Sequence, residues 1–168
     1  NDAAVEVLKK FSKEYDLQVI FQTGKKNFER VIEQLLKVYP DYANDKNLII
    51  KPYFDDMVTV LKASDIAVSR SGSLSLSELS ASGTASILVP YPHAAADHQR
   101  KNAKYMQEKS AALYLEDADT NSQTLSELVS YLLENREELK RLKQNALSLA
   151  KYDAVDLISD KLIEISKA

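Results

Sequence analysis

Short apolar runs alternate with helical patterns along most of this chain, and this alternation limits the fold more than any other feature. Most side chains in each run are apolar on both faces of the expected strand, as in parallel strands that helices cover on both sides. The runs span residues 17–21, 47–50, 65–68, 85–89 and 112–115. Helices are expected between them, over residues 2–14, 27–38, 55–63, 73–82 and 97–109. This order predicts an α/β fold with a doubly wound parallel sheet.

Amphipathic segments follow the last apolar run. Apolar residues recur at helical spacing over residues 122–133, 136–149 and 153–165, which predicts helices packed on the sheet. No internal repeat or linker interrupts the pattern, so we expect a single domain over residues 1–168.

Composition excludes several classes of protein. The chain is 45% hydrophobic and 28% charged, which is typical of a globular domain. A net charge of -3 leaves no basic surface for nucleic acid, so nucleic acid is not an expected partner. The absence of cysteine excludes a disulfide framework and a thiolate zinc site. No apolar run approaches the ~20 residues of a membrane span and no signal peptide is visible at Asn1, so we expect a soluble chain.

A serine-rich segment from Ser69 to Gly83 directly follows the apolar run 65–68. It predicts a strand, a tight turn at Gly72 and a helix. The free N–H groups and the positive end of that helix would face whatever lies beyond the strand. Such a helix start suits an anion such as a diphosphate, and the carboxylate of Glu78 nearby indicates a nucleotide.

Glu78 has two interpretations. Long helical side chains lean toward the helix N-terminus, so Glu78 would reach the space in front of the turn, where it suits ribose hydroxyls. Alternatively, Ser75 and Glu78 fit the S-x-x-E capping box, in which the glutamate satisfies an N–H at its own helix start. The residues alone leave both open.

The glycines, the acidic pair and the histidines do not form the motifs of other nucleotide sites or of a metal site. Gly24, Gly72 and Gly83 have neither the spacing of a dinucleotide-binding fingerprint nor that of a Walker A loop. Asp55 and Asp56 are interpreted as a helix N-cap and first turn and not as a metal site, because a hard cation needs more oxygen ligands. His93 and His98 have no further ligands to complete a metal shell and are expected in loops near a binding cleft.

The segment from Val89 to Asn102 opens another helix, with Asp97 as its expected N-cap. His98, Gln99 and Asn102 would then face the carboxyl edge of the sheet, where α/β proteins bind ligands. Their amide and imidazole groups are candidates for sugar hydroxyls. The alternative is a solvated helix start.

Together these segments resemble the donor-nucleotide domain of the MurG family, bacterial N-acetylglucosaminyltransferases of peptidoglycan synthesis. The motifs occur in the family's order and cover nearly the whole chain. They are QVIFQTG at residues 18–24, IKPYFDDM at 50–57, SRSGSLSLSEL at 69–79, ASGTASILVPYP at 81–92 and DHQRKNA at 97–103.

The resemblance implies the C-terminal half of a GT-B glycosyltransferase with a Rossmann-like fold. Such an enzyme transfers N-acetylglucosamine from UDP-GlcNAc to the lipid-linked muramyl-pentapeptide and inverts the anomeric centre. The resemblance implies no metal or other cofactor. It also places the whole enzyme at the cytoplasmic face of the plasma membrane, as a peripheral protein that contacts the membrane through its acceptor domain.

The resemblance also implies roles for single residues. Glu78 would bind the ribose hydroxyls, and the turn from Ser71 through Gly72 to Ser75 would stabilise the diphosphate of the departing UDP. Within that turn Ser73, Leu74 and Ser75 would present backbone amides or a hydroxyl. Uracil would lie against Tyr53, Phe54 and Met57, and the sugar against His98 and Gln99. The family commonly has Gln-Gln where this chain has His98-Gln99.

By the same resemblance, a first strand with its Gly-rich loop and a whole acceptor domain would precede Asn1. The general base would lie in that domain, so no residue of this chain is assigned as catalytic, and the chain alone is expected to bind without turnover. The first strand is central in the usual order 3-2-1-4-5-6, so its loss would leave a gap in the sheet.

Three rival functions share these features. A related UDP-sugar lipid glycosyltransferase would share the segment from Gly72 to Glu78. A hydrolysing UDP-GlcNAc 2-epimerase would use the same donor without a lipid acceptor. A nucleotide-binding subunit without catalytic activity would dock on a membrane protein that carries the acceptor site.

Overall fold

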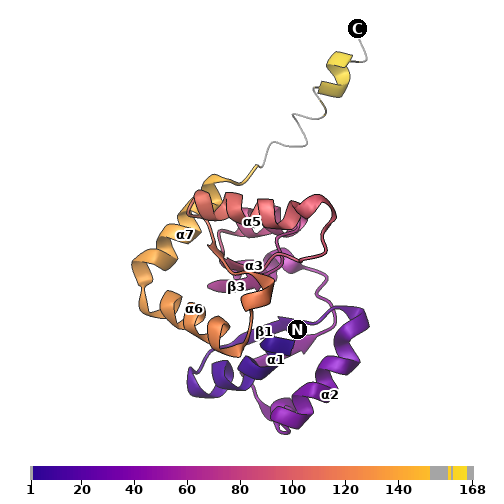
Figure 1. Cartoon of the computed structure of the whole chain (residues 1–168), viewed down its shortest axis with the longest axis vertical. Coiled ribbons are helices and arrows are strands. Elements are labelled where there is room, and N and C mark those ends of the chain that lie inside the picture. The colour runs from indigo at the N-terminus through magenta and orange to yellow at the C-terminus, as the bar shows by residue number, and fades with distance from the viewer. Residues whose placement is uncertain (1, 152–158, 160, 166–168) are drawn as a thin grey trace.

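The computed structural model describes residues 2–151, 159 and 161–165, and Figure 1 shows the whole chain. The strands are β1 (Val19–Gln22), β2 (Leu48–Lys51), β3 (Ile66–Ser69), β4 (Ala85–Leu88) and β5 (Leu113–Tyr114). The α-helices are α1 (Asp2–Lys9), α2 (Phe28–Val38), α3 (Met57–Lys62), α4 (Ser73–Ser82), α5 (His98–Glu108), α6 (Ser122–Glu134) and α7 (Arg136–Ser148). The predicted alternation of strands and helices is confirmed.

The strands are parallel, as predicted, but they form two sheets. One sheet pairs β1 with β2, with Val19 opposite Leu48. The other has the order β3-β4-β5, with Ile66 opposite Ala85. Among the described residues, β1 therefore pairs only with β2, and β3 lacks a second neighbour. The division falls where the resemblance places the strand upstream of Asn1.

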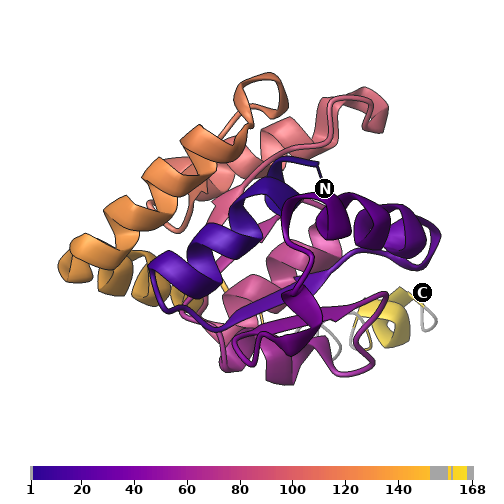
Figure 2. The ribbon, with the colours of Figure 1, turned by 90° about the horizontal axis from the view of Figure 1, so that it is seen from below.

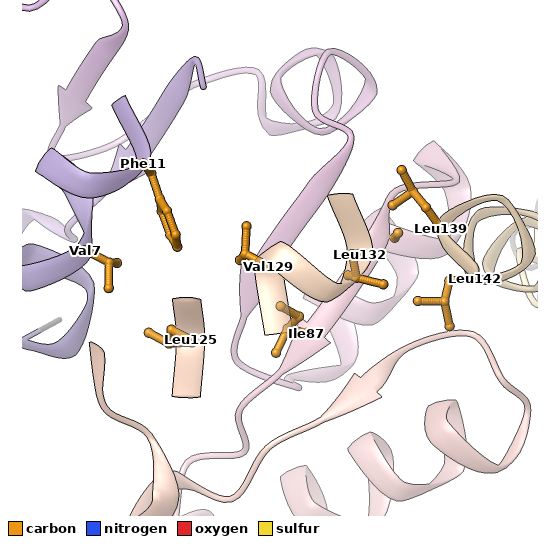
Figure 3. Close-up of a cluster of buried hydrophobic side chains, with 9 residues drawn as sticks. Val7, Phe11, Ile87, Leu125, Val129, Leu132, Leu139 and Leu142 are labelled. Atoms are coloured by element: carbon orange, nitrogen blue, oxygen red, sulfur yellow. The ribbon is translucent and has the colours of Figure 1, made fainter. Parts of the chain in front are cut away.

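Two apolar layers cover the larger sheet. On one face Ile87 of β4 packs among buried side chains of α1, α6 and α7 (Figure 3). On the other face Leu88 packs against Leu79 of α4 and Met106 of α5. Every residue of β4 is buried, as expected for a strand that lies between two helical layers.

α1 connects the two sheets. Its Val7 belongs to the cluster around Ile87, whereas Val5 and Leu8 pack with α2 over the β1–β2 sheet. Figure 2 shows α1 between α6 and α2. The two sheets therefore share one helical layer, although they do not pair with each other.

Several helix boundaries have local causes. α6 begins with a capping box, in which the Asn121 side chain accepts from the Thr124 N–H and the Thr124 hydroxyl accepts from the Asn121 N–H. α4 ends at Gly83, whose φ of 66° is left-handed. A Cβ there would lie 2.6 Å from Leu147 Cγ, so a larger residue would also displace this side chain of α7.

Some expected elements differ in extent. The helix expected over residues 2–14 continues past Lys9 as a π-helical turn, Lys10–Glu14. α3 begins at Met57 and not at residue 55, because Asp56 is its N-cap. The helix expected over 153–165 lies largely outside the described residues. Within this range the structure describes residues 159 and 161–165, and these are helical. No helix in the described part of the chain is long and apolar enough to cross a membrane.

The division of the sheet leads to the first prediction. The Val19 N–H donates to the Asn47 carbonyl before β2, and the Thr23 N–H donates to the Lys51 carbonyl at the end of β2. Because N–H groups alternate along a strand, those of Ile20 and Gln22 point to the opposite edge of β1. On β3, the Ser69 carbonyl accepts from the Val89 N–H that follows β4, so the Val68 N–H points away from β4. We expect a strand upstream of Asn1 to pair with both edges. In a polypeptide extended upstream, amide hydrogen exchange at Ile20, Gln22 and Val68 should slow by about tenfold or more. Unchanged exchange would contradict a strand in this position.

A buried carboxylate supports the second prediction. Asp45 is 6% exposed, and it accepts hydrogen bonds from the Tyr39 hydroxyl at 2.9 Å and the Asn47 amide at 3.0 Å. Lys13 Nζ lies 3.4 Å from the same carboxylate. Burial acts to raise the pKa of Asp45, but the hydrogen bonds and the Lys13 charge outweigh it and hold the pKa at about 2, below its ordinary 3.8.

Since the folded-state pKa of Asp45 is lowered, its contribution to stability is present above about pH 4 and is lost as the pH falls toward 2. Asp45→Asn should cost about 1 to 3 kcal/mol of unfolding free energy at neutral pH. The difference from wild type should shrink between pH 4 and pH 2. Denaturant unfolding across this range measures it. Asp65→Asn, which breaks an exposed pair with Lys143, should cost about 1 kcal/mol or less.

Candidate functional site

The turn after β3 leads into α4 without a side-chain cap. Gly72 is the N-cap, with φ −66° and ψ 150°, and the first intrahelical bond runs from the Leu76 N–H to the Gly72 carbonyl. The N–H groups of Ser73, Leu74 and Ser75 precede that bond and have no helical acceptor. The Leu74 side chain is 71% exposed, so the chain does not cover this helix end closely. The helix start predicted from the serine-rich segment is confirmed.

Glu78 is not part of a capping box. α4 begins at Ser73, so Ser75 lies inside the helix and Glu78 lies in its second turn. The capping interpretation of Ser75 and Glu78 is therefore wrong. Glu78 is half-buried and forms no hydrogen bond or ion pair with the residues the structure describes. Long side chains in α-helices lean toward the helix N-terminus, and the start of α4 lies in that direction from Glu78.

The turn before α4 is fixed to α5 through Ser71, which is fully buried. The Ser71 hydroxyl donates to the Gln99 carbonyl at 2.8 Å, and Asn102 Nδ2 donates to the Ser71 carbonyl at 3.0 Å. Asn102, expected to bind sugar hydroxyls, thus uses its amide to hold the turn. These two bonds place the first turn of α5 beside the first turn of α4.

Gln99 and His98 hold the loop between β4 and α5. Gln99 Oε1 accepts from the Tyr91 N–H at 3.0 Å, and His98 Nδ1 lies 2.6 Å from the Ala95 carbonyl oxygen. The Nε2 donors of Gln99 form no hydrogen bond with the residues that the structure describes. Asp97 is the N-cap residue of α5, as predicted, but its side chain does not cap the helix and instead contacts Arg100 at 3.2 Å. Asp97 has a positive φ of 56°, so its backbone is strained.

Two arginines without a predicted role, Arg70 and Arg100, connect the loops at this edge. Arg70 Nη1 donates to the Val89 carbonyl at 3.2 Å, to the Pro90 carbonyl at 3.0 Å and to Asp117. Arg100 pairs with Glu116 after β5, and the Tyr114 hydroxyl donates to the same carboxylate. This hydrogen bond, together with Arg100, lowers the pKa of Glu116. The loops after β3, β4 and β5 are therefore joined by charged hydrogen bonds.

The β2–α3 loop carries the residues predicted for uracil. Tyr53 is 52% exposed, and Lys25 Nζ lies 5.3 Å from its ring centroid. The Phe54 N–H donates to Gln22 Oε1 at 2.8 Å. Met57, half-buried, opens α3, which packs against α4.

The acidic pair supplies the N-cap of α3 at Asp56, and the two histidines differ in position, since His98 is the first residue of α5 and His93 lies in the loop before it. Asp56 accepts from the Thr59 N–H at 3.0 Å, and its pKa is lowered by its hydrogen bonds to Thr59. His93 packs edge-on against the Tyr91 ring, with 5.6 Å between the ring centroids. In the described part of the chain, no group of three or more acidic and histidine side chains could hold a metal ion. A hollow of about 640 Å³ between α1 and α6 contains none of the predicted site residues.

Comparison with known proteins agrees with the resemblance. The model of the glycosyltransferase family 28 C-terminal domain matches residues 1–158. UDP-N-acetylglucosamine--N-acetylmuramyl-(pentapeptide) pyrophosphoryl-undecaprenol N-acetylglucosamine transferase from Oenococcus oeni is 37% identical over 167 residues, which are 98% of this chain and 43% of that protein. The protein of the same name from Syntrophotalea carbinolica is 38% identical over 160 residues, 94% of this chain and 43% of that protein.

The fold comparison gives the same result. The crystal structure of Acinetobacter baumannii MurG matches with a TM-score of 0.70 and 26% identity, over 86% of this chain and 42% of that chain. The resemblance to the MurG family is confirmed. This chain spans less than half the length of the curated relatives it matches.

Gly72 supports a third prediction. Any residue can adopt its φ and ψ, and a Cβ placed on it would approach only Ser75 Oγ, at 4.0 Å. Nothing in the described chain therefore requires glycine here, and serine would cap α4 better by a few tenths of a kcal/mol. We expect the missing Cβ to leave room for a ligand at the helix end.

Gly72→Ser should keep or slightly raise the melting temperature and weaken binding of a nucleoside diphosphate by about tenfold or more, or about 1.4 kcal/mol. Thermal unfolding and calorimetry separate the two effects. Gly83→Ser is the control, because its left-handed φ and contact with Leu147 should lower stability directly. Wild-type affinity in Gly72→Ser would show that no ligand occupies this space.

Proposed function

This chain belongs to the glycosyltransferase family 28 C-terminal domains, and on that premise we propose that it is the UDP-GlcNAc-binding half of a two-domain GT-B transferase. The intact enzyme would transfer N-acetylglucosamine to the lipid-linked muramyl-pentapeptide of peptidoglycan synthesis, the reaction in the names of its relatives. The acceptor domain, outside this chain, would supply the general base and the contact with the cytoplasmic face of the plasma membrane.

The uncapped start of α4 is the observation on which this proposal mainly rests. As the anomeric bond breaks, negative charge grows on the diphosphate of UDP. The N–H groups of Ser73, Leu74 and Ser75 and the positive end of the helix dipole would stabilise that charge. Because Ser71 is fixed to α5, these donors need not reorganise during the reaction. Gly72 would let the phosphates approach the backbone closely.

The remaining site residues fit the parts of a nucleotide sugar. Glu78, with no partner among the described residues, would accept from the ribose hydroxyls. Tyr53 and Phe54 would hold uracil, with Met57 beside them. His98 and the free Nε2 donors of Gln99 would contact the sugar. Asn102 would act indirectly, by holding the Ser71 carbonyl.

The fourth prediction tests the nucleotide assignment on the full-length protein that carries this chain. Calorimetry should show tighter binding of UDP and UDP-GlcNAc than of ADP or GDP, because a pyrimidine carbonyl and a loop amide make a base-specific pair. Glu78→Gln should weaken UDP by about tenfold, since a bond to a charged partner contributes ~1.5 to 3 kcal/mol. The melting temperature should stay near that of wild type, because Glu78 does not cap α4.

Glu127→Gln, on an exposed face of α6, is the matched control and should leave UDP affinity unchanged. Equal affinity for UDP, ADP and GDP would overturn the uridine assignment. A fall in melting temperature without a fall in UDP affinity would show that Glu78 has only a structural role.

A further inference from the structure

The backbone amide of Phe54 has an unusual partner. Phe54 lies in the loop between β2 and α3, after the strand ends at Lys51 and before the helix begins at Met57. Its N–H donates to the side-chain oxygen Oε1 of Gln22 at 2.8 Å, in an exposed setting. Gln22 is the last residue of β1, and its side chain is exposed. The N–H is thus satisfied by a movable side chain and not by the backbone.

The chemistry of this bond matches that of a pyrimidine. A carboxamide oxygen and a ring carbonyl oxygen of uracil are both neutral sp² acceptors for one N–H donor. Because the Gln22 side chain is exposed, it can rotate away from Phe54 at the cost of one solvent-exposed hydrogen bond. A ligand carbonyl could then take the same position.

Other contacts would keep the loop in place after that rotation. Lys25 lies 5.3 Å from the Tyr53 ring centroid, and Lys51 lies 5.3 Å from the Phe54 ring centroid. Asp56 fixes the end of the loop by capping α3. The Phe54 amide would therefore keep its orientation while it changes acceptor.

We propose that Gln22 occupies, in the ligand-free protein, the hydrogen-bond position that the nucleobase carbonyl takes in the complex. Gln22 is then a specificity-determining residue that competes with the base, so it lowers the affinity for uridine nucleotides and selects against bases without an acceptor at this point. This inference rests on the proposed function, because it assumes that the Phe54 amide reads uracil.

Substitutions at Gln22 test the competition by their direction. Gln22→Ala removes the competing acceptor and should tighten UDP binding by about two- to tenfold. Gln22→Glu offers a charged acceptor that holds the same N–H more strongly, and it should weaken UDP by a similar factor. Affinity for inorganic pyrophosphate, which has no base, should stay unchanged in Gln22→Ala. Gln107→Ala, in the last turn of α5, is the matched control and should bind UDP like wild type.

The measurements are calorimetry and the amide proton shift of Phe54 in the full-length protein. In the free Gln22→Ala variant that amide should lose its hydrogen-bonded shift and recover it when UDP binds. Unchanged or weaker UDP binding by Gln22→Ala would overturn the proposal, and so would equal changes for UDP and pyrophosphate. Failure of the proposed function gives a different result, because wild type would then bind UDP no better than ADP.

Discussion

The burial of β4 on both faces is the constraint on which the larger half of the structure depends. Ile87 and Leu88 point into different helical layers, so helices must cover both sides of the sheet. Parallel strands beside β4 then end at one edge, and the loops that follow β3, β4 and β5 lie together there. Arg70 and Arg100 join these loops through carbonyl and carboxylate acceptors. The apolar core thus determines where the polar site is assembled.

Within that edge, the side chains divide into those that hold the site and those left free. The Ser71 hydroxyl donates to the Gln99 carbonyl of α5, and Asn102 donates to the Ser71 carbonyl in the turn before α4. Gln99 Oε1 accepts from the Tyr91 N–H. Glu78 and the first amides of α4 have no such partners among the described residues. Electrostatic stabilisation of a departing diphosphate requires donors that are held in fixed positions. The hydrogen bond from Asn102 to the Ser71 carbonyl therefore supports the proposed function by fixing the turn before α4.

Much of the fold was predictable, because period and residue type are local properties. The apolar runs predicted every described strand, and the acidic pair Asp55–Asp56 predicted a helix N-cap, which the structure places at Asp56. Partners distant in sequence were not predictable. Arg70 and Asp117 are 47 residues apart, and Gln22 and Phe54 are 32 apart, so only the sheet order brings them together. The role of Glu78 was ambiguous for another reason, since Ser75 and Glu78 also fit a capping box. The structure excludes the capping box, because Gly72 is the N-cap of α4 and Ser75 lies inside the helix.

The proposed site takes groups from both sheets, and this sets a condition on binding. The β2–α3 loop, which is proposed to bind the base, follows β2 of the smaller sheet. The start of α4, which is proposed to bind the diphosphate, follows β3 of the larger sheet. A nucleotide that contacts both segments can bind only when the β2–α3 loop and the start of α4 are held at one distance from each other. In the described chain, α1 links the two apolar clusters through Val5 and Val7, and α3 connects β2 to β3 while packing on α4. A strand that paired with both inner edges would replace this indirect link by backbone hydrogen bonds, which tolerate little displacement. The free energy of binding lost to ordering the two halves would then fall, since preorganisation reduces the cost of association. The proposed affinity for a nucleotide would therefore depend on the same strand that would close the gap between the two sheets.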